Sequence, residues 1–155
     1  MPRSSARLAT NLQNLIPTAN ALAARQEIAD SYGDYMSQAS ASGRILSVTA
    51  ATAAMSAAMN FPIPGTAAGA AAAIQAGCVA FWASMVASPV TSWASATVIV
   101  PPAGLLGITA ALSPIFVSNV GLSLAASATA IAAKLHSASN LGTVTYASPP
   151  PVTIL

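Results

Sequence analysis

The sequence predicts a mainly α-helical chain, in which alanine-rich helices are broken by proline-containing loops and followed by a short C-terminal β segment and an extended proline-rich tail. Alanine, the strongest helix former, accounts for 38 of the 155 residues. Apolar residues recur at spacings of three and four, which places them on one face of a helix. Most of the 11 prolines lie between these segments, where the missing backbone donor ends a helix.

A polar N-terminal arm and an amphipathic helix are predicted over residues 1–43. Residues 4–16 have a short amphipathic helical pattern, which Pro17 closes. Thr18 is a suitable N-cap for a second helix that runs to about Ala41. This second helix carries charged side chains on one face and is typical of a helix that is partly exposed to water.

Residues 44–141 are predicted to form a charge-poor helical domain. Residues 91–100 stay open between helix and strand, because the β-branched residues 97–100 favour a strand whereas the alanines before them permit a helix. We expect a short helix to stop near Pro114. The helices expected in this domain span residues 44–60, 66–87, 104–112 and 119–137.

Residues 142–155 are predicted to form a β segment and an extended tail. Residues 142–146 have β character, and the three prolines at 149–151 impose an extended backbone. Such a tail is either a polyproline ligand for a groove on a partner or an arm that lies on a neighbouring subunit. We expect an arm.

Charge is distributed very unevenly along the chain. No Asp, Glu, Lys, Arg or His occurs between Ile45 and Ala133, and 5% of all residues are charged, against roughly a quarter in ordinary soluble domains. Leu, Ile, Val and Phe together number 36, so an isolated chain buries little bulky apolar surface. We therefore expect most of the outer surface to contact other protein subunits or lipid.

The reactive side chains do not form a catalytic set. Cys78 is the only cysteine, which excludes an internal disulfide and a thiolate metal site within one chain, and it is expected to be a small buried residue. His136 is the only histidine, and with Lys134 it lies at the end of the last predicted helix, where cations are favourable. No phosphate-binding loop or nucleophile elbow occurs, and no run of basic residues could follow a nucleic-acid backbone. We predict no catalytic residue, no cofactor, no metal and no direct contact with nucleic acid.

Small residues recur every fourth position in the helix predicted at residues 66–87 and just before it. This spacing lets two helix backbones approach closely, although a chain that is a quarter alanine also produces it by chance. The large aromatic residues near this segment are either buried or mark an interface. The predicted oligomer interface comprises Gly65, Gly69, Ala73, Gly77, Phe81, Trp82 and Trp93.

Acidic residues of the second predicted helix fall on one face. This face is either solvated or pairs with arginines of neighbouring copies, such as Arg7 or Arg25, around a symmetry axis. The residues predicted for salt bridges between subunits are Arg25, Glu27, Asp30 and Asp34.

A membrane-spanning interpretation also stays open. Residues 66–86 are long enough to cross the roughly 30 Å of hydrocarbon in a bilayer. Against this interpretation, alanine-rich helices insert weakly, and no cluster of Lys or Arg flanks a segment to orient it.

The alanine-rich helices, the Pro101–Pro102 break and the stretch at residues 135–146 together make the chain resemble small alanine- and proline-rich virion structural proteins of tailed phages. This compositional resemblance covers residues 60–155. It implies a non-enzymatic subunit of the tail, the baseplate or a capsid-associated structure, which assembles with copies of itself and with other structural proteins of the virion. The alternative is a membrane oligomer packed through small residues, such as a pore-forming, holin-like or ejection-channel subunit.

Overall fold

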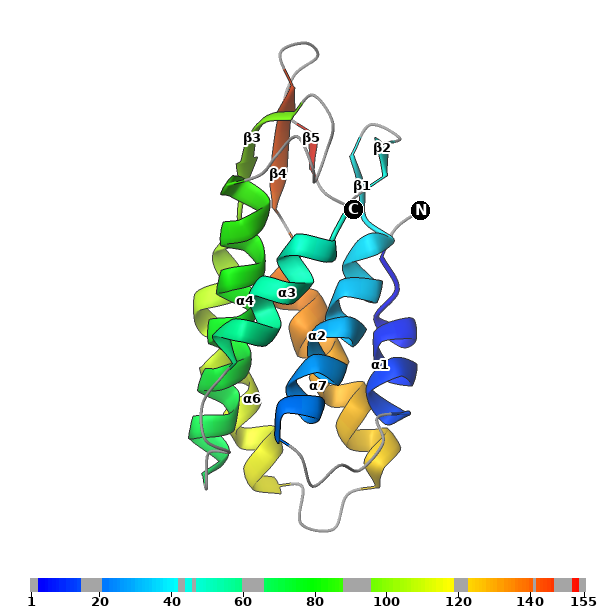
Figure 1. Cartoon of the computed structure of the whole chain (residues 1–155). Helices are drawn as coiled ribbons and strands as arrows, with labels where there is room; N and C mark the ends of the chain where they lie inside the picture. Colours follow the sequence, from blue (N-terminus) through cyan, green and yellow to red (C-terminus); the bar gives the residue numbers. More distant parts are fainter. Residues whose placement is uncertain are drawn as a thin grey trace.

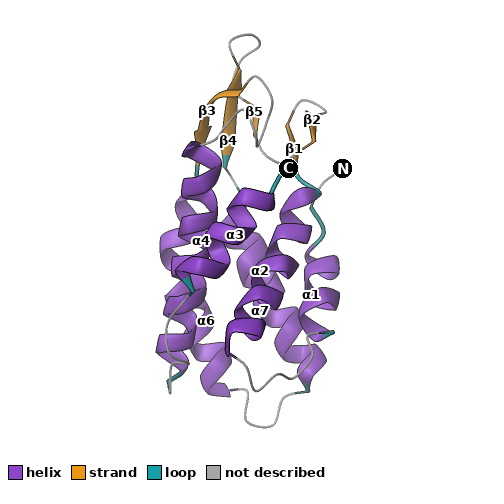
Figure 2. Cartoon of the chain, viewed as in Figure 1, coloured by secondary structure: helices purple, strands orange, loops and turns teal. Residues whose placement is uncertain are grey.

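The computed structural model shows an elongated helical bundle with short strands at one end (Figures 1 and 2). It describes residues 3–14, 21–41, 44–45, 47–59, 66–87, 96–118, 123–140, 142–146 and 152–153. The helices in this part of the chain are α1 (Ser5–Gln13), α2 (Ala21–Ser37), α3 (Thr49–Ala58), α4 (Ala67–Ala87), α6 (Ile108–Ser118) and α7 (Leu124–Ser139), with a 3₁₀ helix η1 (Ala103–Gly107) before α6.

The helices pack in a closed ring. Along the chain, α1 contacts α2, α2 contacts α3, and α3 contacts α4; α4 then contacts α6, α6 contacts α7, and α7 returns to α1 (Figure 1). Serine caps start two of these helices: the backbone N–H of Arg7 donates to Ser4 Oγ at α1, and that of Ala126 donates to Ser123 Oγ at α7. The ring lets alanine-rich helices share one core.

Aromatic rings fill the centre of the bundle. Tyr32 of α2 meets Phe81 of α4 edge to face, with ring centroids 5.1 Å apart. Phe81 in turn lies 6.4 Å from Trp82, and Tyr35 lies 5.9 Å from Tyr32. These four side chains are fully buried. Because the chain has few bulky residues, they supply much of its apolar burial.

Two small antiparallel sheets lie at one end of the helices (Figure 2). The larger sheet pairs β3 (Ala96–Val100) with β4 (Thr143–Tyr146), and β4 with β5 (Val152–Thr153). In its register, Ile99 lies opposite Val144. The smaller sheet is a hairpin of β1 (Ser40–Ala41) and β2 (Arg44–Ile45).

The mainly helical fold class is confirmed. The helices predicted at residues 4–16 and 66–87 are present as α1 and α4, and the β segment predicted at residues 142–146 is present as β4. Strand β3 resolves the ambiguity at residues 96–100, because β4 supplies a pairing partner that the local sequence does not reveal.

Three predicted helix boundaries were wrong. The second helix was predicted to run to about Ala41, but α2 ends at Ser37, and Ser40 and Ala41 form strand β1. Arg44 and Ile45 form strand β2, and the helix predicted from residue 44 begins at Thr49. Pro114 lies inside α6 rather than at its end. The buried residues Ile108 and Leu112 and the half-buried Phe116 continue one apolar stripe through the proline, so packing compensates for the lost backbone hydrogen bond.

The predicted division at residues 43 and 141 stays a prediction. One hydrophobic cluster includes Leu8 and Tyr32 from the first segment as well as Met55 and Leu135 from the second. Other predicted features lie outside the described residues: Pro17, Thr18 and the prolines at 149–151.

Candidate functional site

Helix α4 exposes an apolar stripe. At 100° per residue, the exposed positions lie within about 60° of one another around the helix. None of them carries a polar side chain. They are Ala68, Ala72, Val79, Ala83 and Val86.

A second apolar stripe runs beside the first, on η1 and α6, which pack against α4. Leu106 is 78% exposed and Val117 is 69% exposed, both large values for apolar residues. Ala110 and Pro114 lie between them on the exposed side. We refer to the two stripes together as the uncharged face: Ala68, Ala72, Val79, Ala83, Val86, Leu106, Ala110, Pro114 and Val117.

Polar atoms close to the uncharged face are bonded within the chain. The Gln75 side chain of α4 accepts a hydrogen bond from the backbone N–H of Thr109 at 2.9 Å. The Ser113 hydroxyl donates to the Thr109 carbonyl at 2.7 Å. The first bond joins α4 to α6, and the second lies within α6. The exposed residues of the face itself are all apolar.

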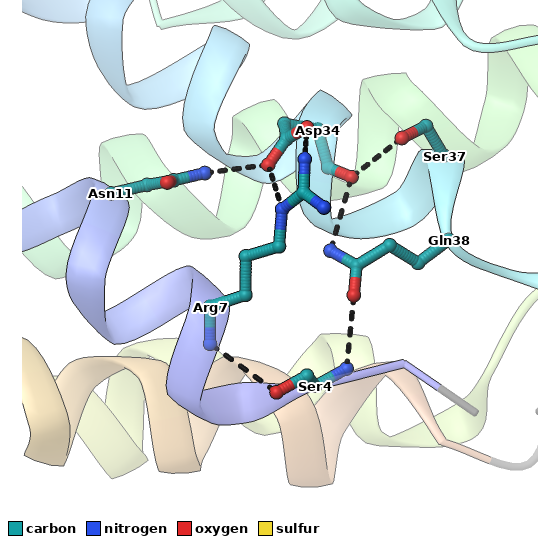
Figure 3. A network of polar contacts seen from close by, with 6 residues as sticks. All are labelled: Ser4, Arg7, Asn11, Asp34, Ser37 and Gln38. Atoms are coloured by element: carbon teal, nitrogen blue, oxygen red, sulfur yellow. Dashed lines mark hydrogen bonds and ion pairs between the residues drawn. The ribbon is translucent and has the colours of Figure 1, made fainter. Parts of the chain in front are cut away.

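The opposite side of the bundle carries charge. Arg7 of α1 donates two hydrogen bonds to the Asp34 carboxylate of α2, at 2.9 and 2.7 Å, and Asn11 donates a third at 2.7 Å (Figure 3). Partial burial raises the pKa of Asp34, but the bonds from Arg7 and Asn11 outweigh it and hold that pKa below its ordinary value. The same network continues through Gln38, which bonds the Asp34 carbonyl and the Ser4 backbone (Figure 3).

The salt bridges predicted between subunits stay a prediction. Within one chain, Asp34 pairs with Arg7. Asp30 accepts a hydrogen bond from Gln26 at 2.8 Å, one turn earlier on α2. Arg25 and Glu27 lie half-buried on the same helix. Asp34 therefore links the acidic face of α2 to α1.

The predicted interface residues fall into three groups: buried, half-buried and outside the described residues. Phe81 and Trp82 are 0% exposed, so they belong to the core of this chain and leave no surface for a second copy. Gly77 faces α3: a Cβ built there would lie 2.7 Å from Met59 Cγ. Close packing at Gly77 thus joins two helices of the same molecule. Gly69 and Ala73 are half-buried, whereas Gly65 and Trp93 lie outside the described residues.

Sequence reasoning missed a set of buried polar contacts in the core. The Tyr32 hydroxyl lies 2.6 Å from Ser139 Oγ and accepts a hydrogen bond from Trp82 Nε1 at 3.2 Å. Burial raises the pKa of Tyr32 and raises that of Cys78 to about 12, so both stay protonated at neutral pH. Nothing in the sequence near Ser139 indicates this contact, because its partner Tyr32 lies 107 residues earlier in the chain.

A shallow hollow of about 410 Å³ lies between α2 and α3. Gln26, Asp30 and Asp34 line it on one side, and Thr49 and Thr52 on the other. Among the residues that the structure describes, no three His, Cys, Asp or Glu side chains come together as a metal site.

The chain was compared with protein-family models, with curated proteins and with solved structures, and it matches none of them. Ala67–Val86 is the one span in the described part of the chain that is long and apolar enough to cross a membrane, and a third of it is buried inside the bundle. Core helices of soluble proteins pass the same test.

Proposed function

We propose that the chain is a non-enzymatic structural subunit of a large homo-oligomeric assembly, and that this assembly belongs to a phage virion, as part of the tail, the baseplate or a capsid-associated structure. The observation that supports assembly is the uncharged face on η1, α4 and α6. The compositional resemblance over residues 60–155 supports the virion.

The size of the uncharged face is compatible with a specific interface. Helix α4 has 21 residues, which corresponds to a length of about 31 Å, and neighbouring helices lie about 10 Å apart. Two adjacent stripes of this length cover roughly 500–600 Å². Two such faces bury roughly 1,000–1,200 Å² in total, close to the lower limit of stable interfaces.

The chemistry of the face favours a protein partner over lipid. Alanine contributes little to insertion into hydrocarbon, where leucine, isoleucine, phenylalanine and valine supply most of the transfer energy. Small side chains instead let helices approach closely and lose little side-chain entropy on contact. A charged partner surface would lose hydration against methyl groups without gaining an ion pair.

A paired set of lysine substitutions tests the assembly. We expect Val79→Lys with Val86→Lys to convert the oligomer to a monomer that keeps its helical circular dichroism, measured by light scattering after size-exclusion chromatography. Ala6→Lys with Gln13→Lys is the matched control, because both positions are exposed on α1 and have the same spacing. A wild-type chain that is monomeric at high concentration, or lysine variants of the face that assemble as the wild type does, would contradict the proposal.

A membrane oligomer is the second candidate, favoured by the apolar span Ala67–Val86. The two candidates differ in extraction. A virion subunit co-sediments with purified particles and stays with them in buffer without detergent, whereas a bilayer protein resists high-salt and carbonate washes and dissolves only in detergent.

A further inference from the structure

The segment before α1 is held in a buried polar site. Arg3 is 5% exposed, and its guanidinium carbon lies 5.5 Å from the centre of the Tyr35 ring. One of its nitrogens donates to Asn140 Oδ1 at 3.2 Å, and another lies 3.2 Å from the Met36 sulfur. Arg3 thus joins the start of the chain to α2 and to the end of α7.

His136 lies in the same site, one helical turn before Asn140. Its Nδ1 atom is 2.8 Å from the Tyr35 hydroxyl, and the two rings meet edge to face with centroids 5.9 Å apart. Burial raises the pKa of Tyr35 to about 12, so that this hydroxyl keeps its proton at neutral pH. A neutral His136 can therefore accept the hydrogen bond from Tyr35.

Protonation changes both interactions at once. An imidazolium has two N–H donors and no acceptor, so the Tyr35 proton must turn away to restore a bond. The new positive charge also lies beside Arg3. Desolvation lowers the pKa of His136 most, and repulsion from Arg3 lowers it further. The pKa of His136 is lower in the folded chain than in the unfolded chain. The folded state is therefore destabilised as the pH falls below about 6.5, and it keeps its full stability above that value.

The surrounding elements supply few other titratable groups. Helix α1 contributes Arg7, whose charge is engaged by Asp34. Helix α2 contributes Tyr35 and, deeper in the core, Tyr32, which bonds Ser139. It also carries Arg25, Glu27, Asp30 and Asp34, of which Asp34 pairs with Arg7 and Asp30 bonds Gln26. The sequences of η1 and α6 contain no titratable side chain, and Lys134 is exposed on α7 itself. Arg3 is therefore the positive charge that His136 meets in this site.

We propose that Arg3, Tyr35 and His136 form an acid-sensitive latch, which holds the N-terminal segment against α7 at neutral pH and releases it when His136 is protonated. Release frees Arg3, Ser4 and the first turn of α1. The two buried leucines of α1, Leu8 and Leu12, keep the rest of the helix in place. The latch is independent of the proposed assembly, because it uses none of the residues of the uncharged face.

Hydrogen exchange tests the latch in the full chain. We expect the protection factors of the amides in the first turn of α1 to fall several-fold between about pH 7.5 and about pH 5, while those in α4 stay constant. His136→Gln should remove this fall, because a neutral amide oxygen still accepts the Tyr35 bond at both pH values. His136→Lys should expose the segment at both. An equal acid response in the wild type and His136→Gln, or no response in the wild type, would overturn the proposal.

A second measurement begins with the wild type alone. Because His136 is the only histidine, its ring protons give one unambiguous NMR titration. The midpoint should lie below 6.5 in the wild type and should rise in Arg3→Met, which keeps the contact with the aromatic ring but removes the charge. A wild-type midpoint at or above 6.5, or one that Arg3→Met leaves unchanged, would refute the latch.

Discussion

On α1 and α2 the exposed side chains include arginine and aspartate, whereas on α4 and α6 they are alanine, valine and proline. Both halves bury similar side chains: Tyr32 and Leu8 on one side, Phe81 and Leu112 on the other. The comparison separates two requirements. Interior burial fixes the bundle, and the outer surface determines what the bundle contacts.

The largest expected effect tests whether the aromatic core belongs to one chain. Phe81→Ala should lower the free energy of unfolding by about 3–5 kcal/mol, because it removes a buried ring and leaves a cavity. Urea denaturation should give this loss at every protein concentration. Gln13→Ala, exposed on α1 and outside the uncharged face, is the control and should change unfolding by less than about 0.5 kcal/mol. A loss for Phe81→Ala that vanished on dilution would place the ring between subunits.

Two exposed glycines of η1 differ in how closely another helix approaches them. A Cβ at Gly104 would lie 2.8 Å from the Ala138 carbonyl oxygen of α7, whereas a Cβ at Gly107 would have nothing within 4 Å. Gly104→Ala should therefore cost about 1–3 kcal/mol, because backbone atoms cannot move aside cheaply. Gly107→Ala should be neutral or stabilise by up to about 1 kcal/mol. Thermal unfolding of the two variants measures the difference, and equal melting temperatures would contradict the close contact between η1 and α7.

A comparable effect is expected from one buried hydroxyl. Tyr32→Phe leaves Trp82 Nε1 and Ser139 Oγ without the partner they share, which costs about 1–3 kcal/mol. The double variant Tyr32→Phe with Ser139→Ala should lose less stability than the sum of the two single variants, because it leaves no unpaired hydroxyl at position 139. Chemical denaturation of the three variants completes the cycle. Strict additivity would mean that the two hydroxyls do not interact.

Local sequence patterns predicted the helices well because their causes are local. Proline and the spacing of apolar residues act within a few positions, and they located α1 and α4. Strand β3 could not be assigned in this way, since its partner β4 lies more than 40 residues further along the chain. Packing also overrode a local rule at Pro114, which sits inside α6.

The candidate site was less accessible to sequence reasoning. Close helix packing at Gly77 serves a contact within one chain or between two chains equally well, so its spacing alone could not assign it. The pairing of Asp34 with Arg7, 27 residues apart, depends on how α1 lies on α2. By contrast, the absence of charge between Ile45 and Ala133 was evident at once, and it is this property that the uncharged face displays.

The smallest expected effect concerns the charged half. Asp34→Asn should cost about 0.2–1 kcal/mol at neutral pH, because the pair with Arg7 is partly exposed and screened by solvent. The pKa of Asp34 lies below 3.8 in the folded chain, so the unfolded chain binds its proton first as the pH falls. The contribution is therefore present above about pH 4 and is lost below it, where the protonated aspartic acid becomes as neutral as asparagine. Urea denaturation of both proteins at neutral pH and at about pH 2.5 measures this convergence. Asp30→Asn is the control, because Asp30 does not contact Arg7. If Asp30→Asn lost as much stability as Asp34→Asn, the ion pair between Arg7 and Asp34 would not be the cause of the loss.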